Sequence, residues 1–157
     1  MNDLNINLFK KLPLEIIQEY ILPYAYNCQS KILCFDINSF SLVYNYLLKS
    51  YFLRYRFLGE NKIWLQWLVN DIAIFMNNEV ATIYGYTSNC LSKYKRLYSL
   101  KDKSHSYVRE YVWYLTNQEN EKKIIRTNIG LLNVEERLCL VKYITEIINI
   151  QVLLGNV

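Results

Sequence analysis

The sequence contains few of the residues that interrupt regular structure, with four glycines and two prolines among 157 residues. A β-sandwich or β-barrel needs many turns, and glycine and proline supply a large share of them. The chain also has one histidine, His105, and its four cysteines form no C-x-x-C pair. Because a zinc site needs four such ligands at suitable spacing, we expect neither an all-β fold nor a bound metal or cofactor.

The sequence also shows no pattern typical of a secretion signal or of a membrane-spanning segment. The residues after Met1 lack the basic and apolar regions of a signal peptide. The most apolar stretch, 63–76, contains Gln66, Asn70 and Asp71 and is too short to cross a bilayer. We therefore predict a protein that is neither secreted nor attached to a membrane. In a reducing compartment the cysteines are expected to be free, buried thiols: Cys28, Cys34, Cys90 and Cys139.

What the sequence does contain favours helices. Apolar residues make up 52% of the chain and charged residues 20%, a balance typical of a folded core. Apolar residues recur at helical spacing, which predicts helices over 41–57, 63–76 and 106–116 and from 133 onward. We predict an all-α fold, a single compact bundle of about six to eight helices. It would form one domain, 1–157, with an N-terminal part, 12–57, and a helical remainder, 60–154.

Capping residues and apolar stripes refine this prediction. Ser30 suits the start of a short helix, and Asp36 and Ser39 suit caps for the following turns. Asn133, with Glu136 three residues later, is a capping-box variant that predicts the start of the last helix. Residues 80–86 are expected to be helical or irregular, and residues 117–123 to be a polar connector. The stripe of helix 41–57 is Leu42, Val43, Tyr46, Leu47 and Tyr51, and that of the last helix is Val134, Leu138, Val141, Ile144 and Ile148.

Asp71 is the carboxylate that the helical pattern places among apolar residues. It faces away from the polar strip formed by Gln66, Asn70 and Asn77, and a carboxylate in such surroundings must be paired or protonated. We expect a structural partner, such as an arginine, a tyrosine hydroxyl or a backbone N–H. A general base would need a second polar group in the same pocket, and the sequence indicates none. His105 is expected to be a solvated loop residue.

The formal net charge is +4, and the segment 91–109 is its basic region. Tyr94, Tyr98 and Tyr107 lie among its cations. Lysine and arginine neutralise phosphates and tyrosine rings stack on bases, so one interpretation is nucleic-acid binding. The other interpretation is a solvated face beside the bundle. The candidate nucleic-acid contacts are Lys93, Lys95, Arg96, Lys101 and Lys103.

The motif LPLEII at 12–17 predicts a short amphipathic helix. Proline suits the first helical position and an acidic residue the first turn, and the two isoleucines begin an apolar side. Such a helix can dock in a groove of a partner or pack on its own bundle. The candidate partner-binding residues are Leu12, Pro13, Glu15, Ile16 and Ile17.

The same motif opens a series that resembles a large paralogous family of mimivirus-like giant DNA viruses. The N-terminal part, 12–57, is similar to an F-box, a short helical module that recruits ubiquitin-ligase scaffolds. The resemblance implies a viral protein of an amoeba-type host, located in the host cytoplasm (the viral factory) or in the virion. The series continues with YAYNCQ at 24–29, LCFDI at 33–37, WLVNDI at 67–72, MNN at 76–78, ATIYGY at 81–86 and GLLNVEER at 130–137.

From these features we predict a non-enzymatic adaptor that binds a host or viral protein through its F-box-like helix. The alternative is a nucleic-acid-associated or structural virion protein that uses the segment 91–109. An enzyme is the remaining class, and it would need a deep polar pocket around Asp71. We expect no catalytic residues.

Overall fold

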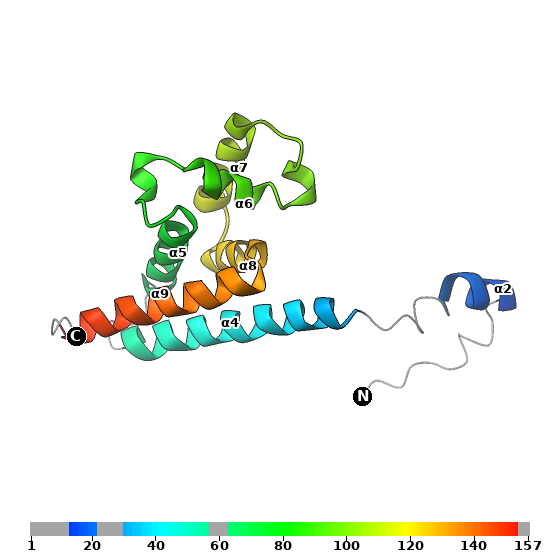
Figure 1. Cartoon of the computed structure of the whole chain (residues 1–157), viewed down its shortest axis with the longest axis horizontal. Coiled ribbons are helices and arrows are strands. Elements are labelled where there is room, and N and C mark those ends of the chain that lie inside the picture. Colours follow the sequence, from blue (N-terminus) through cyan, green and yellow to red (C-terminus); the bar gives the residue numbers. More distant parts are fainter. Residues whose placement is uncertain (1–12, 22–29, 57–62, 154–157) are drawn as a thin grey trace. The chain divides into compact units, whose positions relative to one another are not determined.

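The computed structural model describes residues 13–21, 30–56 and 63–153 (Figure 1). Across these ranges the chain is helical apart from its connections and contains no strand. The predicted all-α fold is therefore confirmed. Seven α-helices lie in these ranges: α2 (Leu14–Ile16), α4 (Lys31–Tyr55), α5 (Ile63–Met76), α6 (Ser88–Tyr94), α7 (His105–Gln118), α8 (Glu121–Leu131) and α9 (Val134–Leu153).

The chain divides into two compact units, Met1–Phe35 and Asp36–Val157. This division differs from the boundary expected between residues 57 and 60, and the single domain expected for 1–157 stays a prediction. In the first unit α2 continues as a π-helical turn over Ile17–Ile21. Pro13 occupies the position before the helix and not its first turn, a shift of one residue that is common at helix ends.

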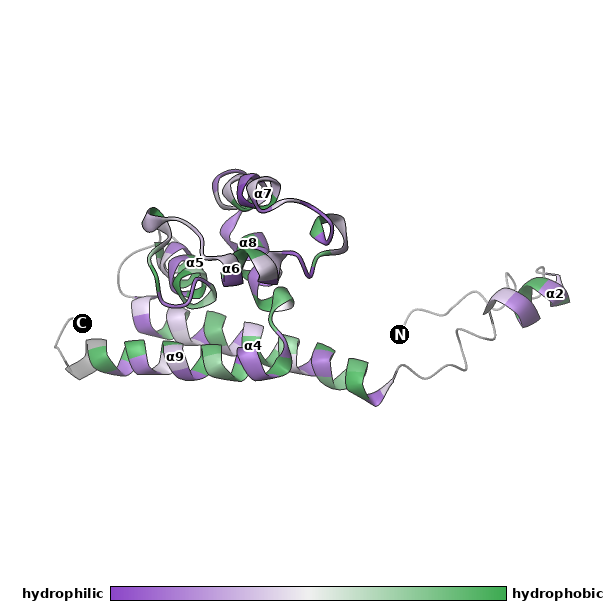
Figure 2. Cartoon of the chain, turned by 45° about the horizontal axis from the view of Figure 1, so that its top comes forward, coloured by the Kyte–Doolittle hydropathy of each residue, from purple (hydrophilic) through white to green (hydrophobic). Residues whose placement is uncertain are grey.

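Helix α5 lies at the centre of the second unit, where it packs against α8, α9 and α6. Its predicted bounds, 63–76, are confirmed. Leu65, Leu68, Ile72 and Met76 are buried at helical spacing and carry α5 into the core. Helix α7 packs against α6 and α8. In both views α4 and α9 lie side by side, across α5 and α8 from α7 (Figures 1 and 2).

Side-chain caps set the start of most of these helices. Thr87, Ser104 and Asn120 each accept a hydrogen bond from the backbone N–H three residues ahead, at the starts of α6, α7 and α8. The predicted capping box of α9 is confirmed, because Asn133 Oδ1 accepts from Glu136 N and Glu136 Oε2 accepts from Asn133 N, both at 2.8 Å.

Two predicted boundaries around α4 and α8 are wrong. Ser30 does cap a helix, with Leu33 N 3.2 Å from its hydroxyl, but that helix continues without a break to Tyr55. Asp36 and Ser39 therefore lie inside α4 and cap nothing. The polar connector expected at 117–123 is reduced to the two residues between α7 and α8. The sequence did not predict α8, because the charged residues of its first turn obscure the helical spacing of the buried Ile124, Ile125 and Ile129 that follow.

A buried asparagine holds the loop between α5 and α6. Asn77 Nδ2 donates to the carbonyl oxygens of Val80 and Gly85, each at 2.9 Å, and its Oδ1 accepts from Thr87 N at 2.7 Å. The side chain is fully buried, so its predicted place in an exposed polar strip is wrong. The side chain supplies bonds that close the loop, whose residues Asn78, Glu79 and Gly85 have positive φ angles.

The cysteines follow the prediction only in part. Cys90 and Cys139 are free thiols, and of the three described cysteines Cys90 is buried while Cys34 and Cys139 are exposed. Cys139 is exposed because it lies on the side of α9 away from the buried Leu140 and Ile144. Cys28 lies outside the described residues. Among the helices of the described ranges, none has the length and apolar character that crossing a bilayer requires.

Candidate functional site

Helix α4 carries apolar residues on two sides. Its buried side carries Val43, Leu47 and Tyr51, which face the core. A second side, turned by roughly 120° about the helix axis, carries Leu42, which is 71% exposed, and Tyr46 and Leu53, which are each 46% exposed. With about 3.6 residues per turn, these three residues at i, i+4 and i+11 share one line along the helix. The prediction that Leu42 and Tyr46 belong to the core stripe is therefore wrong.

The exposed line of α4 continues onto α9. The Tyr46 hydroxyl lies 3.4 Å from Thr145 Oγ1, and Leu138, which is seven residues before Thr145, lies on the same side of α9. Leu138 is also exposed, although the sequence predicted it as core. We call this surface, formed by Leu42, Tyr46, Leu53 and Leu138, the α4–α9 face.

The α4 part of the α4–α9 face carries little charge. Between Ile37 and Leu53 the only charged residue of α4 is Lys49, which follows Leu42 by seven residues and therefore lies on the same line. Protein interfaces are depleted in charge at their centre, whereas most solvated helices alternate polar and charged residues on their outer side. Figure 2 shows hydrophobic residues recurring along α4, while α7 is coloured mainly white and purple.

Contacts with the core and α4 hold this face in place. Arg137 is almost fully buried at the start of α9, and its guanidinium donates to the backbone oxygen and to a carboxylate oxygen of Asp36, at 3.0 and 2.7 Å. Its Nε also donates to Ile129 O. One side chain thereby links α4, α8 and α9, so that the face is built on packed helices and not on a loop.

The predicted partner-binding residues of the N-terminal motif lie in the first unit. Pro13, Glu15 and Ile16 are exposed and Ile17 is half-buried. Leu12 lies outside the described residues. Leu14 and Tyr20, which the sequence analysis did not select, are also exposed there, at 62% and 63%.

Some of the cations predicted to contact nucleic acid make contacts within the protein instead. Lys93 is 7% exposed, and its Nζ donates to Met76 O at 3.0 Å. Arg96 donates to Leu131 O and forms a two-pronged ion pair with Glu136. These two residues therefore serve internal packing. Lys101 and Lys103 remain exposed and Lys95 is half-buried.

Asp71 has the structural partner that the sequence predicted. The hydroxyl of the fully buried Tyr51 donates a short hydrogen bond to Asp71 Oδ2. Burial raises the pKa of Asp71 and the hydrogen bond from Tyr51 opposes that rise. In the folded state the pair joins α4 to α5, so the carboxylate serves packing.

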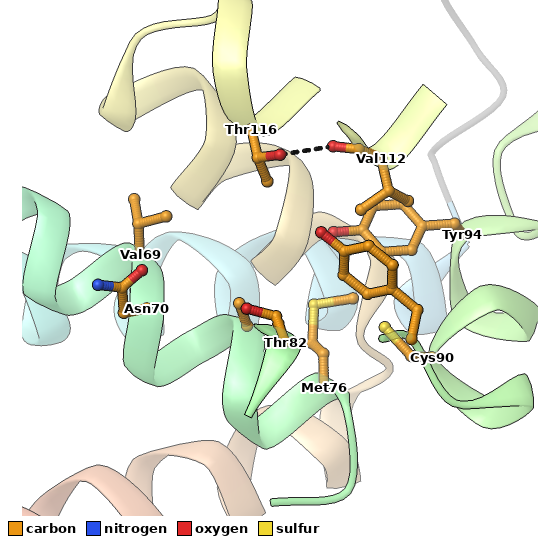
Figure 3. Close-up of a pocket in the computed structure, with 10 residues that line it drawn as sticks. Val69, Asn70, Met76, Thr82, Cys90, Tyr94, Val112 and Thr116 are labelled. Atoms are coloured by element: carbon orange, nitrogen blue, oxygen red, sulfur yellow. Dashed lines mark hydrogen bonds between the residues drawn. The ribbon is translucent and has the colours of Figure 1, made fainter. Parts of the chain in front are cut away.

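A cavity of about 160 Å³ lies between α5, α6 and α7 (Figure 3). Its volume suits a few water molecules or a molecule about the size of benzene. Burial raises the pKa of the Cys90 thiol to about 11, so the thiol is protonated at neutral pH and is a poor nucleophile. The lining residues are Val69, Asn70, Ala73, Met76, Thr82, Tyr86, Cys90, Tyr94, Val112 and Thr116.

Two hydroxyls that line the cavity donate hydrogen bonds within the protein. Thr116 Oγ1 donates to Val112 O at 2.9 Å, and the Tyr94 hydroxyl donates to Asn128 Oδ1 at 2.8 Å. Burial raises the pKa of Tyr86 and of Tyr94. Asp71 is not among the lining residues, and His105 lies apart as the exposed first residue of α7. Within the described ranges, no three His, Cys, Asp or Glu side chains gather as metal ligands would.

Comparisons of the chain with models of protein families, with curated proteins and with solved structures found no match.

Proposed function

We propose that this chain works by binding another protein and does not itself catalyse a reaction. The observation that carries the proposal is the α4–α9 face, where Leu42, Tyr46 and Leu53 expose apolar surface on a side of α4 that the core does not cover. Burying such side chains on association contributes roughly 25 cal/mol for each Å² of apolar surface removed from water. A helix that served only the core of its own chain would gain nothing from them.

The chemistry of the cavity supports the non-catalytic part of the proposal. A general acid or base needs a pKa near the working pH, whereas burial raises the pKa of the Cys90 thiol to about 11. Asp71, the carboxylate considered as a general base, is bonded to Tyr51 on another side of α5. These groups are better suited to stability than to proton transfer.

The partner that we propose is a host or viral protein, as the giant-virus resemblance implies. The F-box-like segment supplies a second binding element, because Leu14, Ile16 and Tyr20 are exposed in the first unit. Recruitment of a ubiquitin-ligase scaffold through this segment is the specific form of the proposal. The α4–α9 face would then hold a second protein.

Site-specific photo-crosslinking tests the proposed face. A photoreactive amino acid placed at Leu42 or at Leu53 is expected to capture one and the same polypeptide from infected host cells. The matched control is Tyr84, which is 81% exposed on the turn between α5 and α6. Adducts that are identical at all three positions, or absent from the two leucine positions, would contradict the proposal. Analytical ultracentrifugation of the purified chain identifies a second copy as the captured protein.

Paired substitutions separate the two binding elements. Leu42→Gln/Leu53→Gln is expected to remove the partner captured through the α4–α9 face, and Ile16→Asp/Ile17→Asp to remove a scaffold protein bound through the first unit. Circular dichroism must match the wild type in each case, since a buried unpaired charge would unfold the chain. If both variants retain every partner, neither surface is a binding site.

A further inference from the structure

We propose that the outer side of α7, with the loop that precedes it, binds single-stranded nucleic acid. This inference goes beyond protein binding and concerns a different surface, since α7 lies across α5 and α8 from the α4–α9 face (Figures 1 and 2). The juxtaposition that carries it is a line of exposed tyrosines on α7 with lysines at its two ends.

The tyrosines follow the helical repeat. Tyr107, Tyr111 and Tyr114 stand at i, i+4 and i+7, which places them on one side of α7. Tyr107 and Tyr114 are 49% and 54% exposed, and Tyr111 is half-buried against the core. The two exposed rings are about 10 Å apart along the helix axis. Aromatic rings at such spacing offer stacking platforms for successive bases of a single strand.

Lysines flank this line at both ends. Lys103 Nζ lies over the Tyr107 ring, 5.4 Å from its centre, so a positive charge stands at one face of that ring. At the other end Lys123 pairs with Glu119 at 2.6 Å and interacts electrostatically with Tyr111 and Tyr114. Lys101 is exposed in the loop before α7, and Tyr98 in the same loop is 96% exposed.

The charge of the chain is concentrated in this part. Residues 95–126 contain eight Lys or Arg against four Asp or Glu, an excess of four that equals the formal net charge of the whole chain, +4. The rest of the sequence is therefore balanced. Of these cations, Arg96 pairs with Glu136 and Arg126 lies over the Tyr44 ring of α4, and the segment also holds the acids Asp102, Glu110, Glu119 and Glu121. The surface beside the tyrosines therefore depends on Lys101 and Lys103 for phosphate contacts, which predicts binding that salt weakens readily.

Stacking and charge together select the ligand. An acidic polypeptide would use the lysines and leave the tyrosine rings without a planar partner. Duplex DNA presents phosphates but keeps its bases stacked inside. A single strand offers both phosphates and free base faces, and its recognition by aromatic rings needs no particular sequence. RNA and single-stranded DNA share this chemistry, and the experiment has an arm for each.

Fluorescence anisotropy with labelled twenty-nucleotide oligo-dT and oligo-U tests the proposal at several salt concentrations. The wild-type chain is expected to bind both, and to bind them more tightly than a duplex of equal length. Tyr107→Ala/Tyr114→Ala should weaken binding roughly ten-fold or more without changing the salt dependence. Lys101→Ala/Lys103→Ala should lower the slope of log K against log salt by roughly 1.4, since each phosphate contact contributes about 0.7 for a single strand.

Matched controls keep the result interpretable. Tyr84→Ala removes a tyrosine that is more exposed than Tyr107 and Tyr114, from a loop whose only charged residue is Glu79, and it should bind like the wild type. Tyr107→Phe/Tyr114→Phe should also retain binding, because the rings remain. The proposal is overturned by absence of binding at low salt, or by equal binding of the two alanine variants at Tyr84 and at Tyr107/Tyr114. Poly-glutamate that binds as tightly as the oligonucleotides, with an affinity that Tyr107→Ala/Tyr114→Ala does not change, would also overturn it.

Discussion

Polar side chains are buried at the junction between α5 and α6, whereas apolar side chains are exposed on the α4–α9 face. At the junction Asn77 and Lys93 are buried and bonded to backbone oxygens. On the face Leu42 and Leu53 are exposed and contact no core. A buried polar group is expensive unless it is bonded, and large exposed apolar patches usually mark a binding surface. The polar residues therefore serve the fold, and the apolar ones are available for function.

The two regions also differ in what a substitution can reveal. Changes at the junction alter stability, because the surrounding backbone groups have no other partners. Changes on the face leave the isolated chain almost untouched and alter only binding.

The largest contrast is expected within α4 itself. Leu47 is fully buried and Leu42 is 71% exposed, five residues earlier on the same helix. Leu47→Ala should lower the free energy of unfolding by about 3 kcal/mol, because it removes buried methyl groups and leaves a cavity. Leu42→Ala should change it by less than about 0.5 kcal/mol. Urea unfolding of both variants measures the difference, and a large loss at Leu42 would place that residue in the core.

Asn77→Ala is expected to lower the free energy of unfolding by about 2–3 kcal/mol. It leaves the carbonyls of Val80 and Gly85 and the N–H of Thr87 without their side-chain partner. Asn70→Ala, at an exposed position in α5, should cost less than about 0.5 kcal/mol. Urea unfolding with amide hydrogen exchange of the loop is the measurement. Similar effects for both would mean that Asn77 does not anchor the loop.

Lys93→Met should lower the free energy of unfolding by only about 1 kcal/mol. The substitution leaves Met76 O unpaired, but it also removes the desolvation cost of a buried ammonium group. Lys101→Met, at an exposed position, should leave stability unchanged. The same variants separate structure from binding, because Lys93→Met should keep the wild-type salt dependence of oligonucleotide binding. A changed slope would place Lys93 at the nucleic-acid surface.

The smallest expected effect is a pH dependence at Asp71. Burial raises the pKa of this carboxyl above its ordinary value of 3.8, so the folded chain binds the proton more readily than the unfolded chain. Its contribution to stability therefore falls as the pH rises from about 3.8 through the raised folded pKa. Asp71→Asn keeps an acceptor for Tyr51 and removes this loss.

Urea unfolding of the wild type and of Asp71→Asn across this pH range tests the point. The stability of the variant relative to the wild type should rise with pH through the window and then stay constant. A relative stability that is constant or that falls with pH would show that the Asp71 carboxyl is not destabilised by burial in the folded chain.

Several features followed from local sequence alone. The bounds of α5 were predictable because its mainly apolar residues lie between clear breaks, and the start of α9 because the side chains of Asn133 and Glu136 bond to each other's backbone N–H groups. The partner of Asp71 was predictable as a class, since a buried carboxylate requires one. Each of these depends on residues within one helix or on a rule that any fold must obey.

The surfaces depended on tertiary structure. Leu42 beside Val43 and Tyr46 beside Leu47 form a stripe too wide for one buried side, which was the available signal that some of them lie outside. Only packing decides which member of each pair faces the core, because helical spacing fixes relative positions on α4 but not its rotation. In the same way, Lys93 and Lys101 have the same chemistry in the sequence, and the approach of α6 to the end of α5 alone removes Lys93 from solvent.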